Sequence, residues 1–172
     1  MITFSTDTGL KEKDIEITGK LAEKYFKTQN DPNQIKVKEA HSKWILNNIP
    51  ECLNIIKDDN TVIGFTLILP CNKVIMNQFL NKKINESELF EQIKKSINYD
   101  NFDTIYLCSV FIAPKYRKHG LASQAFVKSI NKIIQNRKVK PILFYWAYSN
   151  EGKKLIHKIA DIAKLELRER ID

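Results

Sequence analysis

Hydrophobic residues recur three or four positions apart in some stretches of the chain, and alternate or run together in others. Each change of spacing marks a boundary between predicted elements, because helices and strands present their side chains with different periods. The helical spacing predicts helices over residues 14–27, 37–48, 74–80, 121–135 and 150–163. Strands are predicted where β-branched and aromatic residues accumulate, over residues 51–57, 61–69, 104–112, 141–148 and 164–171.

Turn residues between these elements predict how the strands pair. Asp58, Asp59 and Asn60 form a tight-turn signal, so the strands on either side should make an antiparallel hairpin that Pro70 closes. The strand over 104–112 is apolar on both faces and should therefore lie centrally in a sheet. The helix after it leads into the next strand, and such a strand–helix–strand unit predicts parallel pairing with a right-handed crossover.

Residues 72–103 interrupt the strands with helical patterns. Asn85, followed three residues later by Glu88, predicts a helix start of the capping-box type, and an apolar helical stripe then runs to Ile97. The stretch is too short to bury a core of its own. We therefore expect a helical insertion within one domain that spans residues 1–172.

Charge and composition narrow the classes of partner. The net charge of +8 comes from basic residues interleaved with acids, which is typical of a solvated surface, although a polyanionic small molecule, nucleic acid or acidic lipid would also be attracted to it. No nucleic-acid motif supports the nucleic-acid alternative, because the aromatic residues fall at core spacings. No apolar run approaches the ~20 residues of a membrane helix, and we expect no contact with a membrane.

The first residues and the cysteines favour a cytoplasmic protein. The N-terminal residues lack the basic and then apolar pattern of a signal peptide. Cys52, Cys71 and Cys108 are odd in number and show no C-x-x-C spacing. This argues against a disulfide framework or a zinc site and for a reducing compartment, so we predict no metal.

The most informative run is residues 109–126. It predicts a strand that stops at Pro114, a basic loop that contains Gly120, and a helix that begins near Leu121. The first N–H groups of a helix have no intrahelical partner, and with the helix dipole they bind anions. Arg117 adds positive charge. The run therefore predicts a site for a phosphate diester, although it matches neither the Walker A pattern nor the dinucleotide G-x-G-x-x-G pattern.

Arg117, Gly120 and Ala122 match the pattern [Arg/Gln]-x-x-Gly-x-[Gly/Ala], and the context of a strand before and an apolar helix after it matches as well. From about residue 50 to residue 160, the chain resembles the GNAT superfamily of N-acetyltransferases. The resemblance implies an α/β (α+β) fold with a mixed, mostly antiparallel central sheet that contains a splayed pair of parallel strands. It also implies helices on both faces, with the helical insertion between the third and fourth strands.

The same resemblance implies the activity and the site that binds acetyl-CoA. The reaction would be direct attack of a primary amine on acetyl-CoA, with backbone groups of the strand holding the pantetheine arm and loop amides holding the pyrophosphate. Asn150 would contact the cofactor arm, although a plain helix cap is an alternative role for it. The implied cofactor-binding residues are Val110, Phe111, Ile112, Arg117, Lys118, His119, Gly120, Leu121, Ala122, Ser123 and Asn150.

The catalytic groups are less clearly marked. His157 stands where the family often has a tyrosine that protonates the leaving thiolate, and a surface position on an amphipathic helix is the competing interpretation. Tyr148 and Tyr145 are alternative donors, or core aromatics. Cys108 has no visible activating neighbour, so we expect a small buried hydrophobe rather than an acyl carrier.

No general base stands out from the sequence. Asp103, Glu51 and Asp58 lie near strand ends, where acids usually serve turns and solubility. The missing base and the substituted tyrosine leave a second function open, a non-catalytic acyl-CoA-binding sensor or interaction module. The acceptor itself, a small-molecule or peptide amine, carries no recognisable signature.

The C-terminus departs from the family pattern. Residues Asp161 to Lys164 replace the usual Gly-Phe, and only one short strand, over 165–171, follows. The final strand of the usual sheet is therefore absent or supplied otherwise. An open sheet edge of this kind could pair with a second copy in a homodimer.

Overall fold

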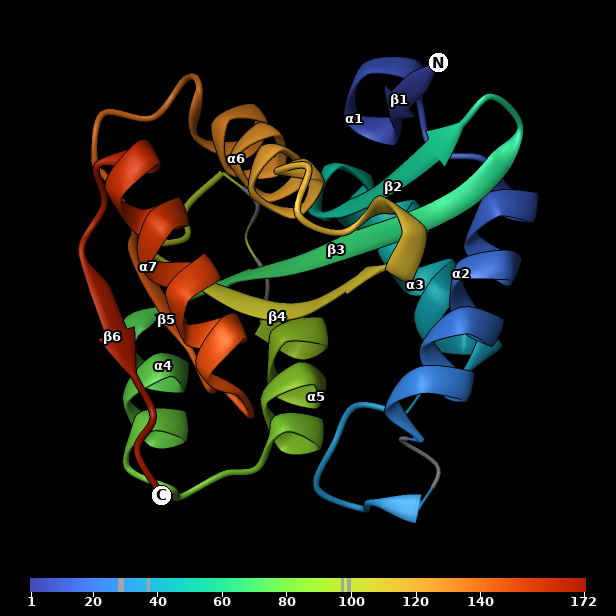
Figure 1. The fold of residues 1–172 in the computed structure, drawn as a ribbon. Helices are drawn as coiled ribbons and strands as arrows, with labels where there is room; N and C mark the ends of the chain where they lie inside the picture. Colours follow the sequence, from blue (N-terminus) through green and yellow to red (C-terminus); the bar gives the residue numbers. More distant parts are fainter. Residues whose placement is uncertain (28–29, 37, 97, 99) are drawn as a thin grey trace.

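The computed structural model describes residues 1–172 except residues 28, 29, 37, 97 and 99. One six-stranded sheet runs in the order β1-β2-β3-β4-β5-β6 (Figure 1). Its strands are β1 (Ile2–Phe4), β2 (Leu53–Asp58), β3 (Thr61–Cys71), β4 (Thr104–Ile112), β5 (Ile142–Tyr145) and β6 (Leu167–Glu169). Neighbours pair antiparallel from β1 to β4 and parallel from β4 to β6, which confirms the mixed sheet and the central place of β4.

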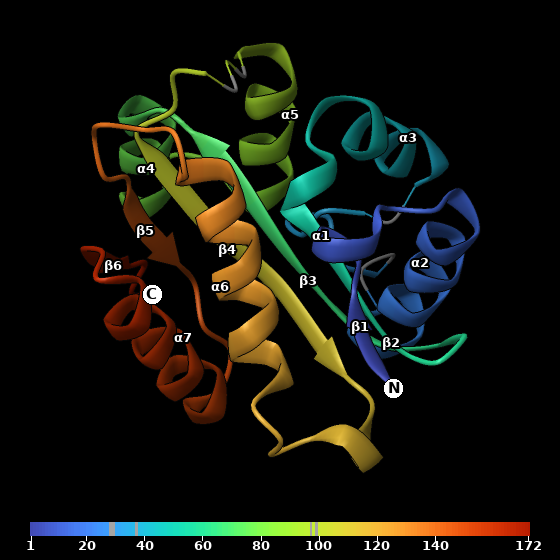
Figure 2. The ribbon, with the colours of Figure 1, turned by 90° about the horizontal axis from the view of Figure 1, so that it is seen from above.

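Helices cover both faces of this sheet, as predicted. They are α1 (Ser5–Thr8), α2 (Glu12–Phe26), α3 (Glu39–Asn48), α4 (Lys73–Leu80), α5 (Glu86–Ser96), α6 (Leu121–Ile134) and α7 (Asn150–Ala163). Helices α6 and α7 lie on one face, and α2, α3, α4 and α5 lie on the other (Figures 1 and 2). Because α4 and α5 connect β3 to β4, the insertion between the third and fourth strands is confirmed.

The capping signals of the sequence have two outcomes. The Asn85 side chain accepts from the Glu88 N–H and the Glu88 carboxylate accepts from the Asn85 N–H, both at 2.8 Å, so the capping box is confirmed. At α7, Ser149 is the cap, since its hydroxyl accepts from the Gly152 N–H at 3.0 Å. Asn150 is the first helical residue, and its alternative role as the cap is wrong.

Strand boundaries differ from the prediction at several places. Strand β2 begins at Leu53 because Pro50–Cys52 form a 3-10 turn, and β6 covers only Leu167–Glu169 of the predicted 164–171. Pro70 lies within β3 opposite Ile105 and does not close the hairpin. The proline is tolerated because β2 pairs with β3 only as far as Leu67, so no β2 ladder bond is lost at Pro70. Strand β5 ends at Tyr145, so Tyr148 belongs to the loop that follows. The predictions at Val37 and Ile97 lie outside the described residues.

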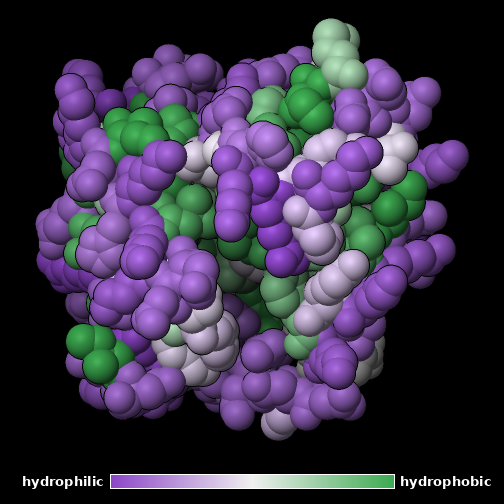
Figure 3. Space-filling model, viewed as in Figure 1, coloured by the Kyte–Doolittle hydropathy of each residue, from purple (hydrophilic) through white to green (hydrophobic). Residues whose placement is uncertain are grey.

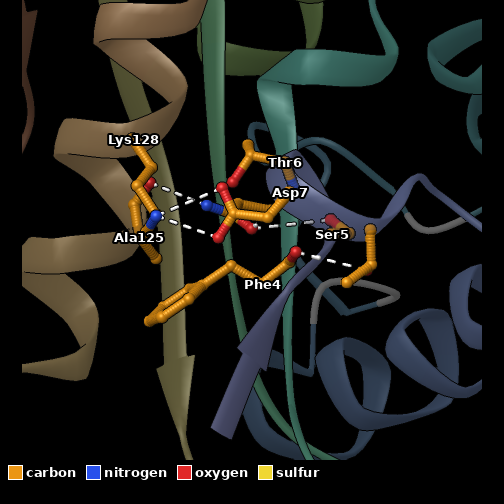
Figure 4. A network of polar contacts seen from close by, with 8 residues as sticks. Phe4, Ser5, Thr6, Asp7, Ala125 and Lys128 are labelled. Carbon is orange, nitrogen blue, oxygen red and sulfur yellow. Dashed lines mark hydrogen bonds and ion pairs between the residues drawn. The ribbon is translucent and has the colours of Figure 1, made fainter.

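A polar network fixes α6 against the start of the chain (Figure 4). The fully buried Asn54 of β2 donates to the Ala125 carbonyl of α6 at 2.9 Å. Asp7 of α1 pairs with Lys128 of α6 at 2.9 Å, and the Ser5 hydroxyl accepts from the β2 backbone. Strand β1 and helix α1 were not predicted, because three or four residues are too few to show a period.

Candidate functional site

The two parallel strands at the centre of the sheet separate along their length. Strand β4 pairs with β5 only from Thr104 to Tyr106, and its remaining residues, to Ile112, have no β5 partner. Its pairing with β3 steps from Leu107 to Ser109, so Cys108 is an extra residue in a β-bulge. A bulge bends its strand and increases the local twist. The backbone of β4 beyond Tyr106 is therefore free to bind something other than β5, and the expected splayed pair is confirmed.

The loop after β4 turns through two left-handed residues before α6 begins. Lys118 and Gly120 both have left-handed backbone conformations, with φ values of 66° and 74°. Gly120 occupies the N-cap of α6, where it has no side chain with which to cap the first amides. The amides of Leu121 and Ala122 have no acceptor within the helix, so they remain available to an anion.

Side chains around this loop hold it in shape and add positive charge. The Arg117 Nε donates to the Ile112 carbonyl at 2.9 Å, and the Ser123 hydroxyl donates to the Gly120 carbonyl at 2.9 Å. Arg117, Lys118 and His119 are exposed. The arrangement combines an unpaired strand edge, a helix N-terminus and basic side chains, which fits a diphosphate at the end of an extended arm.

A cavity of about 480 Å³ opens beside the separated strands. Its lining includes Phe126 and Leu155 from the face of α6 and α7, and Ile45 and Glu86 from the face of α3 and α5. Because residues 107–110 of β4 also line it, the cavity passes through the gap between β4 and β5. Figure 3 shows a hollow with hydrophobic side chains at its bottom and hydrophilic residues around it.

The predicted site residues fall into three places. Gly120 and its neighbours from Arg117 to Ser123 form the loop and the N-terminus of α6. Val110 and Tyr148 line the cavity, whereas Phe111 and Ile112 are buried in β4. Asn150 and His157 line a separate shallow depression on the outer surface of α7, together with Lys153, Lys154, Lys158 and Asp161.

His157 does not line the cavity itself, but it contacts Tyr145, which does. Its Nε2 lies 3.2 Å from the hydroxyl of Tyr145, which is buried and lines the cavity. Burial raises the pKa of Tyr145 to about 12, and Glu169 adds to the shift. The Tyr145 phenol is therefore protonated at neutral pH and is able to donate a proton.

Tyr148 is not a core aromatic. It is 65% exposed and packs against Trp146, with the ring centroids 4.7 Å apart. Partial burial of its hydroxyl end, followed by the nearby Glu86 carboxylate, raises the pKa of this phenol. Tyr148 thus stands at the rim of the cavity as a neutral hydroxyl group.

The other candidates from the sequence lie away from the cavity or lack reactivity. Asp58 pairs with the N-terminal ammonium of Met1 at 2.9 Å and accepts from Tyr116, and these contacts lower the pKa of its carboxyl. Asp103 and Glu51 are not among the described residues that line the cavity. Cys108 does line it, but burial raises the pKa of its thiol, so it is not a thiolate nucleophile at neutral pH.

Glu86 is the residue that sequence reasoning missed. Its side chain lines the cavity, and the residue is only 7% exposed. It accepts from the Tyr106 hydroxyl at 2.7 Å and from the Ile35 N–H at 3.3 Å. In the sequence it appears only as the first residue after Asn85 in a capping box. Its partners are 20 and 51 residues away, so no local pattern marks it as part of a site.

Comparison with known proteins adds one finding. The profile of the Acetyltransferase (GNAT) family matches residues 18–151, from within α2 to the start of α7. The match therefore includes β4, the loop after it and the whole of α6. No curated protein matches the chain in a sequence search. Within the part of the chain that the structure describes, no helix has the length and apolar character needed to cross a membrane.

Proposed function

The chain belongs to the acetyltransferase (GNAT) family, and on this basis we propose that it is an N-acetyltransferase that moves an acetyl group from acetyl-CoA to a primary amine by direct attack. One observation carries the proposal. The free edge of β4 leads to the uncapped N-terminus of α6, and the cavity opens in the gap beside it. A donor with an extended arm and a diphosphate, and an acceptor on the opposite face, fit this arrangement.

The residues that would hold acetyl-CoA are mainly backbone groups. The edge of Val110–Ile112 that faces away from β3 and has no β5 partner would bind the pantetheine arm. Of the predicted loop amides, that of Arg117 donates to the Pro114 carbonyl, so the amides from Lys118 to Ala122 would bind the pyrophosphate. An ordinary side chain at the N-cap would compete for these amides, and Gly120 has none. When bound, acetyl-CoA supplies the acetyl group as a thioester.

The protein's own groups supply charge stabilisation and a proton. N–H groups of β4 that lack a β5 partner are available to the negative charge that develops on the acyl oxygen. Tyr145 would donate the proton that the departing thiol needs, because its phenol is protonated and the residue contributes to the cavity lining. His157 holds the Tyr145 hydroxyl from outside and resupplies its proton.

A non-catalytic acyl-CoA sensor is the second candidate. The observation that favours it concerns His157. In the sequence this residue replaces the usual tyrosine, and in the structure it lies outside the cavity. A sensor would bind acetyl-CoA and release no CoA with any amine.

Cytoplasmic location and a homodimer formed through the edge of β6 remain predictions of the sequence.

The test is release of free CoA thiol from acetyl-CoA across a panel of primary amines, with acetyl-CoA binding measured in parallel by calorimetry. We expect saturable acetyl-CoA binding and thiol release that depends on an amine. Binding without release on any amine would support the sensor. Absence of acetyl-CoA binding would contradict both functions.

A further inference from the structure

The cavity wall is mainly apolar, with polar residues that include Thr18, Gln34 and Ser109. Among the described lining residues only one is an acid. That acid is Glu86, which α5 brings from the insertion to the face opposite α6 and α7. The basic residues of the lining are Lys36, Lys38 and His41. A buried carboxylate in an apolar cavity is costly without a partner, so its presence calls for an explanation.

Glu86 has hydrogen-bonding capacity that the protein leaves unused. An ionised carboxylate accepts about four hydrogen bonds, and Glu86 accepts from the Tyr106 hydroxyl and the Ile35 N–H. Among the described residues, no lysine or arginine forms an ion pair with it. Arg170 is the cation whose charge lowers the pKa of Glu86, but it pairs with Asp172 and donates to the Ile84 carbonyl. The carboxylate is thus free to receive a cation from outside the chain.

We propose that Glu86 binds the ammonium group of the acceptor and takes its proton, and that the acceptor is a primary amine with one positive charge on a compact apolar body. This inference rests on the proposed function, because it assigns the acceptor side of that same cavity. Glu86 is then the general base that the sequence does not reveal.

The contact between Glu86 of α5 and Tyr106 of β4 suits this role. Its partner Tyr106 is the last residue of β4 that pairs with β5, so the carboxylate lies where the strand gap begins. Tyr148 and Cys108 are close enough for the Glu86 charge to raise the pKa of each group. An amine nitrogen held at Glu86 is therefore beside the gap through which the thioester would be presented.

The proton transfer balances within the pair. One N–H bond of the ammonium breaks, an O–H bond forms on Glu86, and the amine keeps the electron pair with which it attacks. Burial raises the pKa of Glu86, while the Tyr106 hydroxyl and the Ile35 N–H oppose that shift. Asp31 raises this pKa and Arg170 lowers it. A raised pKa makes Glu86 a stronger base, because its pKa then lies closer to that of the ammonium group that it must deprotonate.

The walls and the rim define the acceptor class. Side chains such as Ile15, Ile45, Phe65 and Phe90 offer apolar surface to the body of the amine. Burial lowers the pKa of His41, so this side chain is neutral at pH 7. Lys36 and Lys38 belong to the segment before α3 and repel acceptors that carry several positive charges. The lining therefore favours an aryl or alkyl monoamine over a polyamine or an amino sugar.

A purely structural role for Glu86 is the alternative that a test must separate. Through Ile35, the carboxylate ties the segment before α3 to α5, and the Ser87 N–H also donates to the Asn33 carbonyl. The variant Glu86→Gln keeps an acceptor for the Ile35 N–H and a partner for the Tyr106 hydroxyl. It removes the charge and the basicity only. Glu88→Gln is the matched control, because Glu88 is exposed on the same helix and does not line the cavity.

The experiment measures binding by calorimetry without acetyl-CoA, so it does not depend on turnover. The probes are 2-phenylethylamine, its neutral analogue 2-phenylethanol, spermidine and glucosamine. We expect 2-phenylethylamine to bind most tightly, and Glu86→Gln to weaken its binding at least tenfold while 2-phenylethanol is unaffected. Glu88→Gln should bind all probes as the wild type does. The pH dependence of 2-phenylethylamine binding should vanish in Glu86→Gln below the pKa of the amine.

Each of the other outcomes contradicts one part of the proposal, either the role of Glu86 or the acceptor class. Equal binding of 2-phenylethylamine to the wild type and to Glu86→Gln would refute the role of Glu86. Tighter binding of spermidine or glucosamine would refute the acceptor class. Failure of the proposed function looks different: 2-phenylethylamine would bind through Glu86, but no CoA would be released from acetyl-CoA.

Discussion

The N-terminus of α6 and the cavity next to it are built by different means. The loop before α6 is one contiguous stretch, and what it offers is backbone: left-handed residues, an uncapped helix and an unpaired strand edge. The cavity is lined by residues from α2, α3, α5, α6 and α7 and from β2 to β5, together with the segments before α3 and after β5. A donor common to a family suits a site made of backbone, whereas an acceptor suits a site made of side chains that can vary.

This contrast predicts that substitutions on the two sides act independently. Changes at Gly120 should alter acetyl-CoA affinity and leave amine binding intact, and changes at Glu86 should do the reverse. Tyr145 stands between the two regions and should affect turnover alone. The four predictions below are arranged from the largest expected effect to the smallest.

Gly120→Glu should have the largest effect, with acetyl-CoA affinity falling about 1,000-fold because charge-assisted hydrogen bonds worth about 1.5–3 kcal/mol each are lost. A Cβ at Gly120 would meet no heavy atom closer than 3.7 Å, so the added bulk has room. Gly120→Gln has the same size and the same backbone strain without the charge, and should bind at least tenfold tighter than Gly120→Glu. Calorimetry with acetyl-CoA measures both, and equal affinities would refute an anion site at the loop.

Tyr145→Phe should lower kcat about 100-fold, in the usual range for loss of a general acid. The KM for acetyl-CoA should change little, because the phenol is not part of the loop. His157→Asn keeps a hydrogen-bonding side chain next to the Tyr145 hydroxyl and should cost only a few-fold in kcat. Steady-state kinetics separates these cases, and a larger loss from His157→Asn would transfer the donor role to His157.

Asn54→Ala should reduce the free energy of unfolding by about 2 kcal/mol, the order expected for loss of a buried hydrogen bond. Asn54 is fully buried and joins β2 to α6 through the Ala125 carbonyl. Because this contact fixes α6, acetyl-CoA binding should weaken more than binding of 2-phenylethylamine, since Phe126 is the residue of α6 among the described residues that line the cavity. Chemical denaturation and calorimetry provide the two readouts. Equal weakening of both ligands would mean that the two regions are not independent.

The pH dependence of stability should show the smallest effect. Burial raises the pKa of Glu86 above its ordinary value of 4.5, so the folded protein holds this proton at pH values where the unfolded chain has lost it. The contribution of Glu86 to stability is therefore full below pH 4.5 and is lost as the pH rises through the folded-state pKa. The slope is at most about 1.4 kcal/mol per pH unit for one proton.

In Glu86→Gln this slope should disappear, and the variant should be at least as stable as the wild type above pH 7. Thermal denaturation from pH 5 to pH 8 measures the difference between the two proteins, in which the other titrating groups cancel. A variant that is less stable than the wild type across this range would indicate a structural carboxylate. Such a result would remove the reason to assign Glu86 to the acceptor.

The sequence predicted the donor side of the site better than the acceptor side, for a physical reason. The positions of Gly120, the helix start at Leu121 and the strand to Ile112 follow from neighbours in the chain. The capping box at Asn85 is likewise local, and it was predicted correctly. Glu86 lies beside it, but its role depends on Tyr106 and Ile35, which only the folded chain brings together.

Other differences have the same origin. Pro70 was predicted to end a strand because proline lacks a donor, but the end of the β2–β3 pairing at Leu67 makes its place in β3 tolerable. The separation of β4 from β5 was expected only from the family resemblance. The register of β4 supplies its cause, a bulge at Cys108 that no local sequence pattern predicted.

The measurement that tests the account most directly is release of free thiol from acetyl-CoA with 2-phenylethylamine as acceptor, followed across pH for the wild type, Glu86→Gln and Glu88→Gln. The account predicts release that depends on the amine, is equal in the wild type and Glu88→Gln, and is strongly reduced in Glu86→Gln although acetyl-CoA still binds. Thiol release at wild-type rates in Glu86→Gln, or acetyl-CoA binding with no release in any of the three proteins, would contradict it.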